Sequence, residues 1–192
     1  LVSKSFIDGF YFKPRIDRQL LEEYHEGLIA LSACLGGEIP QLLLADEYNK
    51  ALEASKFYKD VFGKENYYIE IQNHSIPEQI KILPKLKSIA NELDLGLVAT
   101  TDCHYINKID SKMQKVLICI QTNHTIDEDN EMEFATEEFY VKSEDEMASL
   151  FADFPGAITN TQKIADMCYF DFHFGGHILP LYETPTGEDN VE

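Results

Sequence analysis

Three short apolar runs alternate along this chain with two longer segments of helical periodicity, and this alternation constrains the fold most. The runs cover residues 28–34, 66–72 and 97–101, and the segments between them cover 47–62 and 77–93. Buried strands separated by amphipathic helices are typical of parallel sheets, whose connections cross over one face. The chain is therefore predicted to be α/β with parallel pairing. A proline inside the second segment predicts a kink or a break there.

The rest of the chain is predicted from shorter signals. Helical spacing or a capping residue predicts helices at 17–26, 40–45, 110–120, 143–151 and 157–168. Four apolar residues of the third of these helices are spaced for burial: Met113, Val116, Leu117 and Ile120. Residues 6–12 are expected to be extended, 139–141 to form a short strand, and 127–138 to be a solvated acidic loop.

Composition excludes several classes of protein. The 192 residues carry a net charge of −18, and a polyanion does not attract nucleic acid through bulk electrostatics, so direct DNA binding by this chain is not expected. No apolar run of about 18 residues predicts a membrane span. The four cysteines show no Cys-x-x-Cys spacing, which argues against a zinc ribbon and suits a reducing compartment. We therefore expect a cytoplasmic protein.

Candidate chemistry gathers where the apolar runs end. Asp102 and His104 follow the third run, and residues two apart in an extended segment point to the same side. Cys34 ends the first run. Thiolate, carboxylate and imidazole together suit zinc, and also manganese or iron. Glu70 and His74, near the end of the middle run, are further candidates.

Each of these residues also has an ordinary interpretation. Asp-x-His arises often by chance, Cys34 can be a small buried hydrophobe, and Glu70 and His74 can be a solvent-facing carboxylate and a polar turn residue. No glycine-rich dinucleotide motif, phosphate loop or nucleophilic serine motif is present, so these chemistries have no motif support.

Longer blocks of sequence resemble a known family. In this order along the chain they are residues 9–17, 31–40, 68–74 with 77–79, 98–105, 117–122 and 139–143. These blocks are similar to the PHP (polymerase and histidinol phosphatase) domain of the bacterial replicative DNA polymerase III alpha subunit. An unrelated α/β hydrolase sharing only Asp-x-His would have to explain all of them as coincidence.

The resemblance implies a fold and a metal site. It implies a partial, distorted barrel of (βα)7 type that lacks its N-terminal strands. Residues 1–175 would be the C-terminal portion of the PHP domain, and 176–192 a linker toward the polymerase core. The family's ligand positions map onto Cys34, Asp102 and His104, which implies a divalent metal, zinc or manganese, with an incomplete site in this segment.

The resemblance also implies two functional alternatives within a full-length DNA-directed DNA polymerase. In one, the PHP domain is a metal-dependent phosphoesterase that proofreads as a 3′-5′ exonuclease. In the other, it is a structural domain that docks partners, and its metal site is degenerate or only braces the fold. In both, DNA and replisome subunits are partners of the full-length protein. The segment alone is expected to be inactive because three ligands leave the site open.

Overall fold

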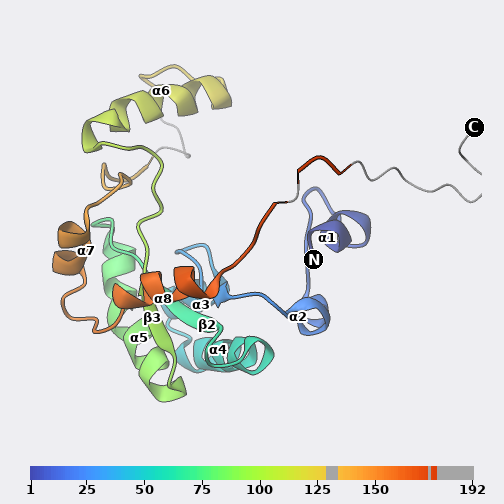
Figure 1. Cartoon of the computed structure of the whole chain (residues 1–192). Coiled ribbons are helices and arrows are strands. Elements are labelled where there is room, and N and C mark those ends of the chain that lie inside the picture. The colour runs from blue at the N-terminus through green and yellow to red at the C-terminus, as the bar shows by residue number, and fades with distance from the viewer. Residues whose placement is uncertain (129–133, 173, 177–192) are drawn as a thin grey trace, which may run out of the picture.

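A three-stranded parallel sheet lies at the centre of the computed structural model (Figure 1). The residues described are 1–128, 134–172 and 174–176. The strands, in their order across the sheet, are β1 (Ala30–Leu31), β2 (Tyr67–Ile71) and β3 (Gly96–Ala99). In the β2–β3 register Ile71 lies opposite Ala99, so these two strands end level with each other. The prediction of an α/β chain with parallel pairing is confirmed.

One face of the sheet forms the main core. Ile69, Ile71 and Leu97 point to this face and are buried with side chains from the connecting helices. These helices are α3 (Glu38–Leu44), α4 (Tyr48–Phe62) and α5 (Pro77–Leu93). Burying each large apolar side chain stabilises the fold by about 1.5–3 kcal/mol. This packing fixes where the strand ends lie.

The edge of β3 is covered by α8 (Thr159–Met167). The Asn160 side-chain amide donates to the Leu97 carbonyl (2.8 Å), and the Ala99 N–H donates to the Ala157 carbonyl (3.0 Å). Gly96 lies against the Tyr68 ring, where an added Cβ would come within 2.7 Å of two ring carbons. Only glycine therefore allows this approach without displacing Tyr68.

The helix predicted at 77–93 is confirmed as α5, but it runs through Pro84 without a break. Proline removes one backbone donor and crowds the preceding turn. Ile82 and Leu83 before it, and Leu86 and Ile89 after it, are all buried against the core. Tertiary packing on both sides of Pro84 therefore holds the helix together.

The strand predicted at 28–34 is shorter than expected. Only Ala30–Leu31 pairs with β2, and Leu31 is 37% exposed. Ala33 has a left-handed backbone with φ of 67°, which ends the extended run before Cys34.

Two predictions were wrong in the peripheral regions, the first of them in part. Residues 6–12 were expected to be extended, but Phe6 and Ile7 belong to α1 (Val2–Ile7), and only an isolated antiparallel bridge between Tyr11 and Lys13 follows. The predicted burial of one face of 110–120 was also wrong. The helix α6 (Ser111–Thr122) forms, yet Met113, Leu117 and Ile120 are 64%, 58% and 72% exposed.

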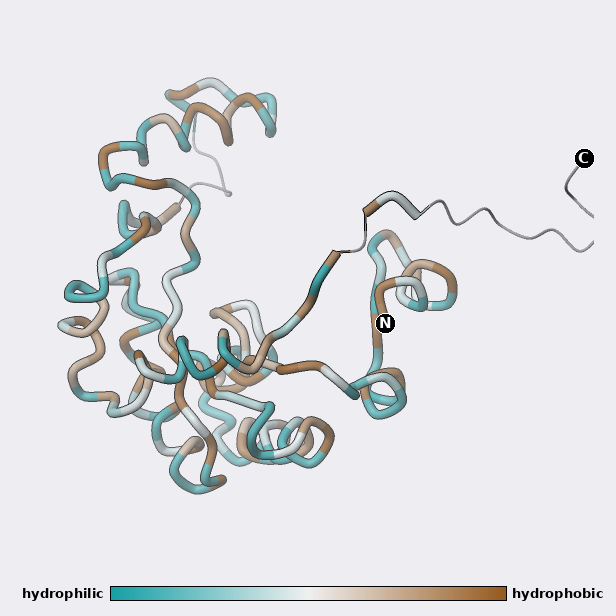
Figure 2. The backbone as a smooth tube through the Cα atoms, in the orientation of Figure 1, coloured by the Kyte–Doolittle hydropathy of each residue, from teal (hydrophilic) through white to brown (hydrophobic). Residues whose placement is uncertain are grey.

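The reason for the second error is visible in the arrangement of the elements. Figure 2 shows hydrophobic stretches on α6, which lies apart from the sheet in the orientation of Figure 1. Helical periodicity predicts that a face is apolar, but it does not predict what covers that face.

Four further elements complete the described chain. They are α2 (Arg18–Tyr24), the 3-10 helix η1 (Lys108–Asp110), α7 (Glu144–Leu150) and a short parallel bridge between Tyr105 and Tyr140. The predicted caps are confirmed at Asp17, which accepts from the Leu20 N–H, and at Ser143, which forms a capping box with Glu146. None of the described helices is long and apolar enough to cross a membrane. The predicted linker falls almost wholly on 177–192, outside the described residues.

Candidate functional site

The C-terminal ends of the three strands are joined by a polar network. The Ser32 hydroxyl, just past β1, accepts from the Glu70 N–H (2.8 Å). The Thr100 hydroxyl and the Gln72 amide both donate to Glu70 Oε1 (2.5 and 3.2 Å), and Gln72 also donates to Thr100 Oγ1 (3.0 Å). Of the predicted candidates, Glu70 is therefore engaged in tying the strand ends together.

Asp102 and His104 lie side by side in the loop that follows β3. His104 Nε2 is 3.4 Å from Asp102 Oδ1, and the two side chains are 39% and 44% exposed. Asp102 has a left-handed backbone with φ of 42°, so the pair is brought together by a turn and not by regular strand alternation. The predicted convergence is correct, but the predicted reason for it is not.

The separation of these two atoms fits a shared metal ion. Zinc binds imidazole nitrogen and carboxylate oxygen at about 2.0–2.2 Å, and the edge of a tetrahedron of that size is roughly 3.4 Å. A carboxylate and an imidazole are also acceptable ligands for manganese. Asp102 and His104 thus have the chemistry and spacing of two candidate ligands open to solvent.

Cys34 lies in a different place. Its exposed thiol lines a small cavity of about 10 Å³ together with Glu70 and Gln72, and neither Asp102 nor His104 lines that cavity. Among the described residues, no three His, Cys, Asp or Glu side chains are grouped so that they could hold an ion. The five candidates therefore lie in or after three different strands and are not gathered at one point, and the three-ligand set stays a prediction.

His74 is only 1% exposed, and both of its ring nitrogens are engaged by protein atoms. Nε2 lies 2.8 Å from the Thr101 carbonyl oxygen, and Nδ1 lies 2.9 Å from the Gln79 side-chain nitrogen. The Gln79 carbonyl oxygen accepts from the His74 backbone N–H (2.7 Å). In this arrangement neither ring nitrogen is open to an ion.

An aromatic cluster connects His74 with His104. The Phe139 ring stacks on His74 with centroids 4.2 Å apart, and Phe134 lies 4.5 Å from both Phe139 and His104. The His104 backbone N–H donates to the Phe139 carbonyl (2.8 Å). Sequence patterns did not indicate that Gln79, Phe134 or Phe139 belongs to this region, although Gln79 lies in the first turn of α5, five residues after His74.

Charged groups hold the 138–146 segment against this loop. Lys108 and Lys142 contact the Glu138 carboxylate and keep its pKa below the ordinary value. The Tyr140 hydroxyl donates to Glu146 (2.7 Å); this bond raises the pKa of Tyr140 to about 12 and, with the Ser143 cap, lowers that of Glu146 to about 2. The Lys108–Glu138 contact joins this segment, which forms a wall beside His104, to the loop, and the other contacts lie within the segment.

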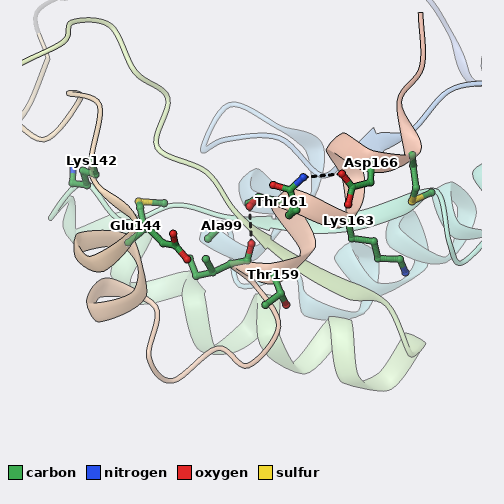
Figure 3. A pocket seen from close by; sticks show the side chains of 11 residues that line it. Ala99, Lys142, Glu144, Thr159, Thr161, Lys163 and Asp166 are labelled. Carbon is green, nitrogen blue, oxygen red and sulfur yellow. Dashed lines mark hydrogen bonds between the residues drawn. The ribbon is translucent and has the colours of Figure 1, made fainter.

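A wide groove of about 880 Å³ lies elsewhere, along α7 and α8 (Figure 3). Lys142, Glu144, Lys163 and Asp166 line it, so its charge is mixed. Neither Asp102 nor His104 lines this groove. It is therefore not part of the candidate metal site.

Part of the chain matches a known domain family. Residues 1–74 match the PHP domain family. Nearly the whole chain is also similar to one segment of DNA polymerase III subunit alpha from several bacteria. Identity is 43% over 185 residues with the protein of Treponema pallidum, and 42% over 186 residues with that of Borreliella burgdorferi; each alignment covers 96% of this chain.

The protein of Thermus aquaticus is 40% identical over 200 residues and covers the whole chain. The resemblance to the PHP domain of DNA polymerase III alpha subunits is confirmed by these matches. The chain spans only 16% of the length of each of these three relatives.

Proposed function

We propose that this chain is the PHP segment of a bacterial DNA polymerase III alpha subunit, and that the full-length protein carries out DNA-directed DNA synthesis in chromosome replication. The observation that carries this proposal is the similarity over 96% of the chain to such subunits. Residues 1–175 are then the C-terminal portion of a distorted (βα)7-type barrel, and 176–192 lead toward the polymerase core. The protein acts in the cytoplasm with DNA and other replisome subunits.

We further propose that the loop after β3 contributes ligands to a divalent metal site. Asp102 and His104 would bind the ion directly, because their donor atoms are 3.4 Å apart and open to solvent. Cys34 would join them from the end of β1, and the other ligands would come from polypeptide outside this segment. Zinc and manganese both suit this mixture of donors.

The reaction that such a site serves is 3′-5′ exonucleolytic cleavage, that is, proofreading. A bound divalent ion activates water and neutralises charge on the scissile phosphate. Asp102 and His104 would supply donor atoms for the ion. The 138–146 segment positions His104 through the hydrogen bond to the Phe139 carbonyl. Because this chain has a net charge of −18, DNA must be delivered by basic surfaces elsewhere in the full-length protein.

A structural role is the alternative, and one observation favours it. Glu70 and His74, which have the chemistry of ligands, are occupied by Thr100, Gln72 and Gln79 and serve to tie loops together. If the whole region works in this way, the domain supports the polymerase and docks partners, with a degenerate site or an ion that only braces the fold.

Metal analysis of the full-length protein distinguishes the two roles. Metal content is measured by mass spectrometry, and manganese-dependent release of 3′ nucleotides is measured in parallel, for the parent, Asp102→Asn and His104→Phe. Asparagine tolerates the left-handed backbone at 102, and phenylalanine keeps the ring contacts at 104. Exposed His124→Phe is the matched control.

If metal and cleavage are lost together in both variants, the exonuclease is supported. If metal is retained without cleavage in the parent, the structural role is supported. If the parent contains no metal and cleaves nothing, the metal site is rejected. Polymerase activity, measured on the same samples, tests the assignment to the alpha subunit separately.

A further inference from the structure

We propose that His74 and Gln79 together are a positioning device for the metal-binding loop, and we call the pair the His74–Gln79 clamp. The clamp holds the Thr101 carbonyl and thereby sets where Asp102 and His104 point. This inference rests on the proposed metal site for its function. Its structural part, control of the loop, stands independently of that site.

The hydrogen bonds of the clamp indicate which ring nitrogen of His74 donates and which accepts. The Gln79 Oε1 accepts from the His74 backbone N–H, so the other end of the Gln79 amide is the NH2 group. An amide NH2 only donates, so Nδ1 of His74 is the acceptor in their 2.9 Å contact. Nε2 then carries the proton and donates to the Thr101 carbonyl at 2.8 Å. Both ring nitrogens of His74 are therefore paired.

The bond to Thr101 acts at a strained point of the chain. The next residue, Asp102, has a φ of 42°, a region that non-glycine residues seldom occupy. A conformation of this kind is strained and persists only where the surroundings enforce it. The clamp fixes the carbonyl on one side of Asp102, so it supplies part of that enforcement.

The other side of the loop is held from the same place. The His104 backbone N–H donates to the Phe139 carbonyl (2.8 Å). The Phe139 ring stacks on the His74 imidazole with an angle of 9° between the planes. The Thr136 hydroxyl donates to the His74 carbonyl (2.7 Å). His74 therefore contacts the segments that hold both ends of the Thr101–His104 turn.

Burial indicates that this network specifies one arrangement. His74 and Gln79 are 1% and 5% exposed, and the large majority of polar groups this deep in a protein are hydrogen-bonded. A fully paired buried network rigidifies its surroundings. Outer partners that orient metal ligands change metal affinity by about 10–100-fold when they are removed.

His74→Phe is the variant that tests the clamp most directly. Phenylalanine keeps a ring against Phe139 but removes both nitrogens, leaving the Thr101 carbonyl without its donor. His74→Gln should restore part of the loop's protection, because the glutamine side-chain amide can donate to the Thr101 carbonyl. Ile89→Ala, in the buried core of α5, is the control for general destabilisation, since Ile89 is fully buried and belongs to the core beneath the sheet.

Two measurements on the full-length protein are made for each variant. Hydrogen–deuterium exchange of the metal-free protein reports on a peptide covering 97–106, and electron paramagnetic resonance reports manganese affinity. We expect His74→Phe to speed exchange in this peptide by about tenfold or more, because local opening becomes easier, and to weaken manganese binding by about 10–100-fold. His74→Gln should fall between His74→Phe and the parent, and Ile89→Ala should leave both close to the parent.

The clamp is overturned if His74→Phe leaves the exchange of this peptide unchanged, or if Ile89→Ala alters it equally. A parent whose manganese binding does not depend on Asp102 would reject the proposed metal site alone. Exchange would still decide in that case whether the clamp positions the loop.

Discussion

The ends of β2 and β3 carry the same two kinds of side chain and use them differently. At the end of β2, the Glu70 carboxylate accepts from Thr100 and Gln72, and the His74 ring is bonded through both nitrogens. After β3, Asp102 and His104 are 44% and 39% exposed and face each other at 3.4 Å. Residue type alone therefore does not identify a candidate ligand. Its donor atoms must also be free of hydrogen bonds to the protein and open to solvent.

The two strand ends are also dependent on each other. The Thr100 hydroxyl and the Thr101 carbonyl, both at the end of β3, are held by Glu70 and His74 from the end of β2. The internally bonded pair therefore acts as a support for the open pair. Variants that affect activity and stability separately test this difference between the two strand ends.

The largest expected effect is on cleavage by the full-length protein. Asp102→Asn should lower manganese-dependent 3′ cleavage by about 100-fold or more. Removing a residue that only orients a metal ligand already costs about 10–100-fold, and the loss of a direct ligand should cost at least as much. Its effect on unfolding should stay within about 0.5 kcal/mol, as for other exposed positions. Glu70→Gln should keep cleavage within about tenfold of the parent. If Glu70→Gln loses as much metal as Asp102→Asn, Glu70 is itself a ligand, and the proposed difference between the two strand ends is wrong.

A second expected effect concerns the 192-residue chain without the rest of the protein. Two exposed candidate ligands, with which Cys34 is not grouped, do not fix an ion in the way that two-metal phosphoesterases require. The chain alone should therefore cleave a 3′ end no faster than its own Asp102→Asn version under manganese. Cleavage by the chain that disappears in this variant would contradict the expectation of an incomplete site.

A third and smaller effect is on stability at the end of β2. Glu70→Ala removes the acceptor for Thr100 and Gln72, and leaving partly buried donors unpaired costs about 1–3 kcal/mol each. Urea unfolding should detect this loss, whereas Glu53→Ala on the exposed face of α4 should change stability by less than about 0.5 kcal/mol. A Glu70→Ala protein as stable as the parent would mean that the strand-end network contributes little.

How far the sequence predicts these features depends on how local their causes are. The helix 77–93 and the caps at Asp17 and Ser143 follow from residues near one another in the chain, and all were predicted correctly. The closeness of Asp102 and His104 was also predicted, since they are two residues apart. The exposed face of α6 and the short β1 depend on what lies opposite them, which no local pattern contains.

The roles of Glu70 and His74 were open for a similar reason. Their partners Thr100 and Thr101 are about 30 residues away in sequence and meet them only through the parallel register of β2 and β3. Gln79, by contrast, is five residues from His74 and is brought back by the first turn of α5. A histidine followed by the start of a helix that carries a glutamine is a signal that sequence reasoning can use.

The smallest expected effect is a pH dependence in the wall beside His104. The Tyr140 hydroxyl and the Ser143 cap lower the folded-state pKa of Glu146 to about 2, from an ordinary value of 4.5. Because the folded pKa is the lower one, this contribution is fully present above about pH 4.5 and is lost as the pH falls toward 2. Urea midpoints should therefore fall less steeply with acid over this range in Glu146→Gln than in the parent. Glu144→Gln, which alters the first turn of α7 without replacing the Ser143–Glu146 capping box, is the control. Identical acid slopes in the parent and Glu146→Gln would mean that the Tyr140–Glu146 bond does not stabilise the 138–146 segment in solution, and the position of His104 would then depend on its bond to the Phe139 carbonyl and on the His74–Gln79 clamp without help from Glu146.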